Sequence, residues 1–286
     1  MIKPVLRIVI TRLFQIMGLS LAGLFIQRAI VGPNHIRVLS YHDTPPGTAD
    51  GLRVQLEYFC RHFDPAAPGD LSALLSGERR RRPGLIVTFD DGIWSNYAVA
   101  APLLERFGFV GWFFVPASLM GSTPNGDPPP DLAIHIKTVP PNRSSFMTWD
   151  ELRDLRARGH MIGCHSLTHR RLGDQLDDAT LQSEITDSKE HIENELGETI
   201  ESFAWVGGDE RSYGAKAANL IRRSAFRFGF MSNSAPVTPA TDPLQINRTN
   251  VETSWPFYRV QFSLSGMLDL VYRGKRRRVD RLTASA

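Results

Sequence analysis

Short apolar segments rich in β-branched and aromatic residues alternate along this chain with segments of helical periodicity. The predicted strands are 36–41, 85–89, 111–115, 161–164 and 202–206, with weaker candidates at 228–231 and 244–248. The predicted helices lie between them, at 95–107, 148–158, 178–196 and 213–224. Because strand and helix alternate, the sequence predicts an α/β fold built on a mainly parallel sheet or an α/β barrel.

A single barrel domain suits the 286 residues, and two smaller domains would fit the length as well. We expect a catalytic domain over residues 32–265, followed by a basic tail at 266–286. The segment 121–141 is rich in proline and glycine and has no periodicity, which predicts a long loop that shapes a site at the strand ends. Two cysteines make no disulfide framework and leave the compartment open.

Residues 1–31 contain no acidic residue and many apolar side chains. On a helical wheel Lys3 and Arg7 share one side with Thr11, which favours a basic amphipathic helix on a membrane surface. Two alternatives remain open: a signal peptide cleaved near residues 20–22, and a helix packed on the domain itself. We therefore expect a membrane-associated protein of the cell envelope, with secretion as an alternative.

The predicted strand 85–89 ends in two adjacent carboxylates, Asp90 and Asp91. Burying two neighbouring negative charges is costly unless a positive charge lies close by, and a divalent cation would supply it. His165 and His169 follow another predicted strand, and the ends of parallel strands meet on one face of the fold. Two imidazoles and a carboxylate with open positions are typical of a catalytic zinc site, or of a related iron or cobalt site.

These motifs resemble the polysaccharide deacetylase family, carbohydrate esterase family four. The resemblance rests on residues 88–92 (TFDDG) and 165–169 (HSLTH), with supporting segments at 113–115 (FFV), 148–152 (TWDEL) and 158–160 (RGH). It covers about residues 35–251 and implies a distorted (β/α) barrel with fewer than eight strands. It also implies metal-dependent hydrolysis of an N-acetyl or O-acetyl group on a sugar, with Asp91, His165 and His169 as metal ligands and Asp90 as general base.

Three further assignments follow from the resemblance. Residues 39–43 (LSYHD) resemble the early Tyr-His segment of one branch of the family, which makes His42 the expected general acid. Residues 203–208 (FAWVGG) replace the usual third motif and lack its arginine, and Gly207 stands where the family uses a backbone N–H for the oxyanion. Arg248, within 247–251 (NRTNV), either orients Asp90 in place of that arginine or forms a salt bridge across the barrel end.

The sequence thus predicts a hydrolase that deacetylates a polysaccharide or its lipid-linked precursor, with Zn²⁺ as the expected metal. The alternatives are an amidohydrolase acting on a small or peptidoglycan-type substrate, and a degenerate barrel that binds glycan without cleaving it. The expected partners are an acetylated glycan and, through residues 1–31, a membrane surface. Nucleic acid is not expected, because the basic runs at 79–82 and 275–278 have no stacking aromatics among them.

Overall fold

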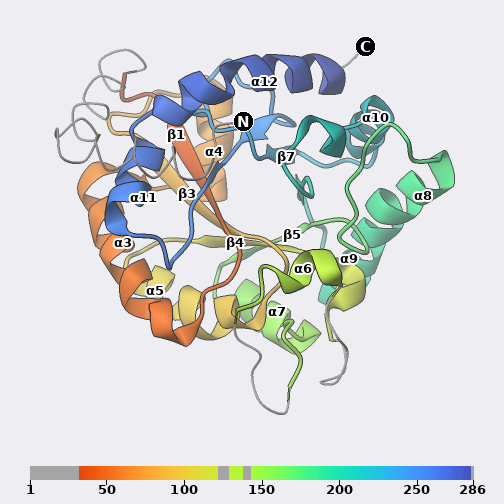
Figure 1. Cartoon of the computed structure of the whole chain (residues 1–286), viewed down its shortest axis with the longest axis horizontal. Helices are drawn as coiled ribbons and strands as arrows, with labels where there is room; N and C mark the ends of the chain where they lie inside the picture. Colours follow the sequence, from red (N-terminus) through yellow and green to blue (C-terminus); the bar gives the residue numbers. More distant parts are fainter. Residues whose placement is uncertain (1–31, 122–128, 138–142, 285–286) are drawn as a thin grey trace.

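A computed structural model describes residues 32–121, 129–137 and 143–284. The expected amphipathic helix at residues 1–31 therefore lies outside the described residues. Within the described part, parallel strands form a nearly closed barrel that is surrounded by helices (Figure 1). No helix of this part is long and apolar enough to cross a membrane.

Six strands of the barrel have three or more residues, and all were predicted from the sequence: β1 (Ile36–Tyr41), β3 (Gly84–Phe89), β4 (Gly111–Val115), β5 (Met161–Cys164), β6 (Ser202–Ala204) and β7 (Phe228–Met231). The short strands are β2 (Asp64–Pro65), β8 (Ile246–Asn247) and β9 (Thr249–Asn250). The row runs β8-β7-β6-β5-β4-β3-β1-β9, with β2 paired to β3 outside it. The resemblance implied fewer than eight strands, and this is wrong, because the short strands β8 and β9 complete a row of eight. The weaker predicted strand 244–248 contains β8, whereas β9 leaves no periodic signal in the sequence.

The barrel is brought close to closure by one short segment of the chain. β8 pairs in parallel with β7 and β9 pairs in parallel with β1, so the two ends of the row are consecutive in the sequence. Only Arg248 separates β8 from β9. Its backbone N–H donates to Met231 on β7, while the N–H of Val251 donates to Ser40 on β1. Arg248 therefore sits at the seam of the barrel.

Alternation along the strands divides the core into two layers. On β4, Trp112 and Phe114 belong to a cluster that fills the barrel, where Trp112 meets Phe230 edge to face at 5.3 Å. The neighbouring Phe113 and Val115 belong to a larger cluster beneath the surrounding helices. The barrel interior is thus filled mostly by apolar side chains.

The helices around the barrel are α3 (Ala49–His62), α4 (Pro68–Leu75), α5 (Ala101–Arg106), α6 (Pro130–Ala133), α7 (Trp149–Ala157), α8 (Asp178–Gln182), α9 (Ser188–Leu196), α10 (Ala215–Arg223), α11 (Phe257–Leu264) and α12 (Met267–Thr283). The predicted capping box begins α7, where Thr148 Oγ1 accepts a hydrogen bond from the N–H of Glu151 and the Glu151 carboxylate accepts one from the N–H of Thr148. The predicted helix 178–196 is α8 and α9 joined by a π-helical turn at Ser183–Asp187.

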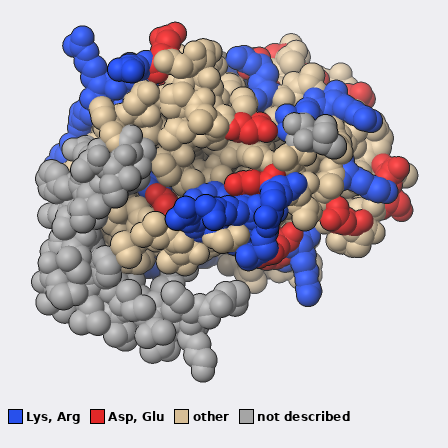
Figure 2. Space-filling model, turned by 90° about the horizontal axis from the view of Figure 1, so that it is seen from above, with Lys and Arg blue, Asp and Glu red and all other residues tan. Residues whose placement is uncertain are grey.

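Most of the segment 266–286, expected as a basic tail, is the helix α12. Leu268 and Val279 of this helix are buried, and Asp269 forms a salt bridge with the buried Arg37 of β1. The face of the molecule on the side of α12 carries a band of Lys and Arg side chains with acidic residues among them (Figure 2).

Candidate metal centre

Asp91, His165 and His169 come together at the carboxyl ends of the barrel strands. Asp91 follows β3, and His165 directly follows β5. Asp91 Oδ1 lies 3.5 Å from Nε2 of His165 and 3.2 Å from Nε2 of His169. All three side chains are buried, and their candidate ligand atoms lie within 4.8 Å of one another. The structure thus brings together the three residues that the sequence predicted as metal ligands.

The backbone at this site adopts conformations that non-glycine residues rarely use. Asp91, Ser166 and His169 have φ angles of 73°, 62° and 62°, in the left-handed region. The β4–β5 ladder continues one residue beyond β5, because the N–H of His165 donates to the Val115 carbonyl at 2.9 Å. Strained backbone of this kind persists only where the surroundings hold it, and it gathers at functional sites.

Glu184 holds the turn that carries the two histidines. One of its carboxylate oxygens accepts hydrogen bonds from the N–H groups of Leu167 and Thr168, at 3.0 and 2.9 Å. The other accepts from the Thr168 hydroxyl at 2.6 Å. Glu184 lies on the π-helical turn between α8 and α9 and is only 4% exposed. This carboxylate therefore fixes the backbone between His165 and His169.

The polar atoms of the cluster fit a divalent cation. Both carboxylate oxygens of Asp91 are buried and have no hydrogen-bond partner, which is costly for an ionised group without a counter-charge. Nδ1 of His165 donates to the Ala204 carbonyl at 2.8 Å, which leaves the Nε2 lone pair directed toward Asp91. Without a cation, burial would raise the pKa of Asp91, but the imidazoles of His165 and His169, when protonated, hold it well below its usual value. A metal would therefore meet a carboxylate and imidazole nitrogens ready to bind it.

Asp90 binds Arg248, whereas its neighbour Asp91 faces the two histidines. Its carboxylate accepts two hydrogen bonds from Arg248, 2.6 Å from Nη1 to Oδ1 and 2.9 Å from Nη2 to Oδ2. Ser40 on β1 donates to Oδ2 at 3.1 Å. Burial would raise the pKa of Asp90, but Arg248 and the nearby His165 lower it overall. Asp90 is thus held ionised next to the cluster, and the structure places Arg248 where it can orient it.

His42 follows β1 and approaches the cluster from the other side. Its Nδ1 donates to Oε1 of Glu252 at 2.8 Å, and a nitrogen of its ring lies within 4.8 Å of an Asp91 oxygen. Burial would lower the pKa of His42, but the hydrogen bond to Glu252 and the charge of Asp91 raise it to about 9. In the metal-free protein this raised pKa favours the imidazolium form of His42 at neutral pH.

The model of the polysaccharide deacetylase family matches residues 77–228, just over half of the chain. The chain belongs to the polysaccharide deacetylase family. Among curated proteins, YxkH of Bacillus subtilis (strain 168), which is named as a polysaccharide deacetylase, is 23% identical over 195 residues. That alignment covers 65% of this chain and 61% of YxkH, so the chain spans about three fifths of the length of its relative.

Three solved structures share the fold of this polysaccharide deacetylase family member. The deacetylase PplD of Streptococcus pyogenes has a TM-score of 0.64 at 20% identity, over 81% of this chain and 99% of its own. The deacetylase domain of BpsB from Bordetella bronchiseptica has a TM-score of 0.62 at 23% identity, over 76% and 96%. IcaB of Ammonifex degensii has a TM-score of 0.60 at 20% identity, over 80% and 95%. At these identities the likeness establishes a common fold and no more.

Gly207 lies in the segment where this chain departs from the usual third motif of the family. Its φ is 78°, and a Cβ built there would lie 2.7 Å from Oγ of Ser212 and 3.0 Å from Nε of Arg171. Both the backbone conformation and the close side chains therefore favour glycine at this position. The role of its N–H toward an oxyanion stays a prediction.

Three residues that touch the predicted site were not foreseen: Glu184, Glu252 and His135. Glu252 directly follows the segment 247–251, and His135 lies in the long loop that was expected to shape the site. His135 stacks on His42, with ring centroids 4.2 Å apart. Glu184 lies within an ordinary helical pattern, so the sequence carried no signal for it.

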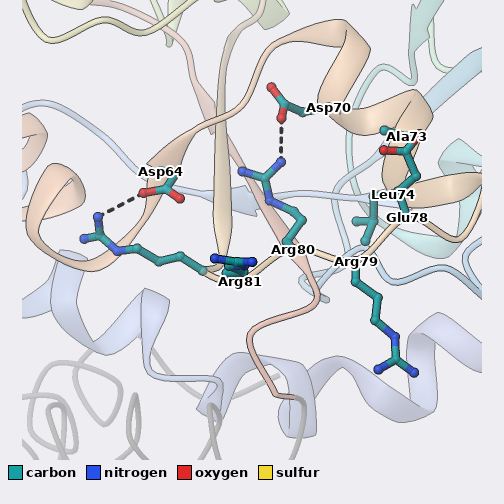
Figure 3. A pocket seen from close by; sticks show the side chains of 9 residues that line it. Asp64, Asp70, Ala73, Leu74, Glu78, Arg79, Arg80 and Arg81 are labelled. Carbon is teal, nitrogen blue, oxygen red and sulfur yellow. Dashed lines mark hydrogen bonds and ion pairs between the residues drawn. The ribbon is translucent and has the colours of Figure 1, made fainter.

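A hollow lined by arginines lies away from this centre. Arg79, Arg80 and Arg81 line it, Arg80 reaches Asp70 at 2.7 Å, and Arg82 reaches Asp64 at 2.9 Å (Figure 3). These arginines precede β3, whereas Asp90 and Asp91 follow it, so the hollow lies at the opposite end of that strand. Its acidic lining offsets much of the positive charge.

Proposed function

We propose that this polysaccharide deacetylase family member removes acetyl groups from N-acetylated sugars of a polysaccharide, with a bound divalent cation. The observation that carries this proposal is the environment of Asp91. Its two buried oxygens have no hydrogen-bond partner, two imidazoles face it, and an ionised Asp90 is its neighbour in the chain. A barrel that only bound glycan would have no need of a buried charge arrangement of this kind.

Asp91, His165 and His169 would hold the cation. When bound, the cation supplies Lewis-acid chemistry, which activates water and polarises the acetyl carbonyl group. Zn²⁺ is the metal we propose, because a carboxylate and two imidazoles with open positions suit its coordination preferences. Two residues of this chain then carry out the proton transfers, one as general base and one as general acid.

Asp90 is the proposed general base. Arg248 and Ser40 bind its carboxylate from the barrel side and keep it ionised, so it can accept a proton from the attacking water. Gly207 is the proposed backbone donor to the oxyanion, at a position whose backbone and close neighbours favour glycine.

His42 is the proposed general acid. As the C–N bond of the acetamide breaks, the leaving sugar amine needs a proton, and the hydrogen bond to Glu252 raises the pKa of His42, which favours a proton on its ring at neutral pH. Glu252 binds Nδ1 of this ring, so the other ring nitrogen remains available for transfer. After turnover the proton taken up by Asp90 must return to His42 through solvent.

Membrane association is a further proposal, and it rests on the pattern of residues 1–31 alone. A basic amphipathic segment there would keep the domain near an envelope polysaccharide or its lipid-linked precursor.

Acetate release from a panel of N-acetylated and O-acetylated glycans tests the proposal. The protein is stripped with a chelator and then reloaded with zinc, cobalt or iron in separate samples. We expect acetate from at least one N-acetylated glycan, loss of release after stripping and recovery on reloading. Asp90→Asn serves as the matched variant, because it keeps the metal ligands and removes the base. Wild-type turnover by Asp90→Asn, or no acetate from any glycan with the metal bound, contradicts the proposal.

A further inference from the structure

His135 lies face to face with His42 at the edge of the candidate metal centre. The ring centroids are 4.2 Å apart and the ring planes are inclined by 12°. His135 is half-buried, and one of its nitrogens lies within 4.8 Å of both an Asp91 oxygen and a His42 nitrogen. This histidine therefore covers one face of the proposed general acid and borders the space beside Asp91.

The segment that carries His135 is anchored at both ends. Before it, Leu132 of α6 is fully buried in the core beneath the helices, and its carbonyl accepts the N–H of His135 at 2.8 Å. After it, the N–H of Lys137 donates to Oδ2 of Asp43 at 2.7 Å. Asp43 directly follows His42 in the chain. The segment with His135 is thus tied to the same short segment that carries His42.

The stacking geometry decides between two roles for His135. The atoms of His42, Asp91 and His135 are close enough to suggest a second metal site. A metal ion, however, lies in the plane of each imidazole that binds it through a nitrogen lone pair. Two rings inclined by only 12° cannot both direct a lone pair at one ion. The contact between these rings is therefore a packing contact.

We propose that His135 is a positioning residue for His42, an inference that rests on the proposed function. Glu252 binds Nδ1 at one edge of the His42 ring, and His135 covers one face. Together they hold the ring in a single orientation beside the metal centre, with one of its nitrogens within 4.8 Å of an Asp91 oxygen. A flat ring also excludes water from that face of His42. The contribution of His135 comes from its ring face, and its nitrogens are not required.

Two substitutions separate a stacking role from a chemical one. His135→Ala removes the ring, and we expect kcat for acetate release to fall by about tenfold to a hundredfold, because a displaced acid loses its alignment with the leaving group. KM and bound metal should stay near the wild-type values. His135→Phe restores a flat ring without nitrogens, and we expect it to recover most of kcat. Ile134→Ala, at an exposed neighbour on the same segment, is the control.

A second measurement does not depend on activity. In wild-type protein with labelled histidines, the His42 ring proton should show the upfield shift caused by a stacked ring. His135→Ala should abolish this shift and His135→Phe should keep it, with the resonance assigned through His42→Ala. Wild-type kcat in His135→Ala, or equal losses in the Ala and Phe variants, would overturn the inference. An inactive wild-type protein that shows the expected shifts would instead count against the proposed function.

Discussion

Arg248 and Asp90 are 158 residues apart in the sequence and form a buried salt bridge with two hydrogen bonds. Arg248 is 1% exposed, and its guanidinium also lies over the ring of Phe114, 5.4 Å from the ring centroid, inside the barrel. The position of Arg248 between β8 and β9 explains this geometry, because the seam of the barrel directs its side chain inward. The closure of the barrel and the charge of the proposed base thus depend on the same residue.

Replacing Arg248 tests this dependence. Arg248→Met leaves Asp90 buried without its main counter-charge, and we expect a loss of about 3–5 kcal/mol in the free energy of unfolding. Since Arg248 lowers the pKa of Asp90, its loss raises that pKa and moves the acid limb of the kcat profile to higher pH. Arg248→Lys keeps a positive charge without the paired hydrogen bonds. Its free energy of unfolding and its acid limb should therefore lie between those of the wild type and those of Arg248→Met.

The control for Arg248 is Arg227→Lys, in an exposed pair with Glu201. Exposed ion pairs contribute about 0–1 kcal/mol, so this change should leave the free energy of unfolding and the pH profile nearly unchanged. Urea unfolding and pH profiles of acetate release provide the two measurements. An unchanged acid limb in Arg248→Met would mean that Arg248 does not set the ionisation of Asp90.

Glu184→Gln tests how far the turn between the histidines controls metal binding. The substitution replaces one acceptor oxygen by an NH₂ donor, which cannot accept the hydrogen bonds that Glu184 receives from Leu167 or Thr168. Partners of metal ligands typically contribute about 10–100-fold to metal affinity, and we expect a loss of that size. Competition with a chromophoric chelator measures it. Glu190→Gln, at an exposed position of α9, should bind metal like the wild type.

The pair of His42 and Glu252 predicts a pH dependence of stability in the metal-free protein. The folded pKa of His42 is raised from 6.5 to about 9. A raised pKa means that the stabilisation is fully present below about pH 6.5 and is lost as the pH rises through about 9, with a total of about 3 kcal/mol. Urea unfolding of wild type and His42→Gln between pH 6 and 10 measures it. If the free energy of unfolding changes with pH in the same way in both proteins, the pair makes no such contribution to stability.

The sequence predicted the longer strands from their periodicity and the metal-cluster residues from their motifs. β1, β4, β5 and β7 begin and end where predicted, because each is an apolar run bounded by turn signals. Asp91, His165 and His169 were predicted to meet because parallel strands end on one face. The weaker candidate at 244–248 contains the two-residue strand β8. β9 and the inward direction of Arg248 could not be predicted, because they are created by tertiary pairing. The roles of Glu184 and His135 could not be predicted either, because both residues act through contacts with distant parts of the sequence.

Zinc binding to the matched pair Asp90→Asn and Asp91→Asn tests the central claim most directly. The two variants change adjacent residues by the same chemistry, and isothermal titration of the chelator-stripped proteins measures stoichiometry and affinity without any substrate. We predict one equivalent of zinc in wild type and in Asp90→Asn, and loss of tight binding in Asp91→Asn, because only Asp91 faces both His165 and His169. Wild-type zinc affinity in Asp91→Asn would contradict the account.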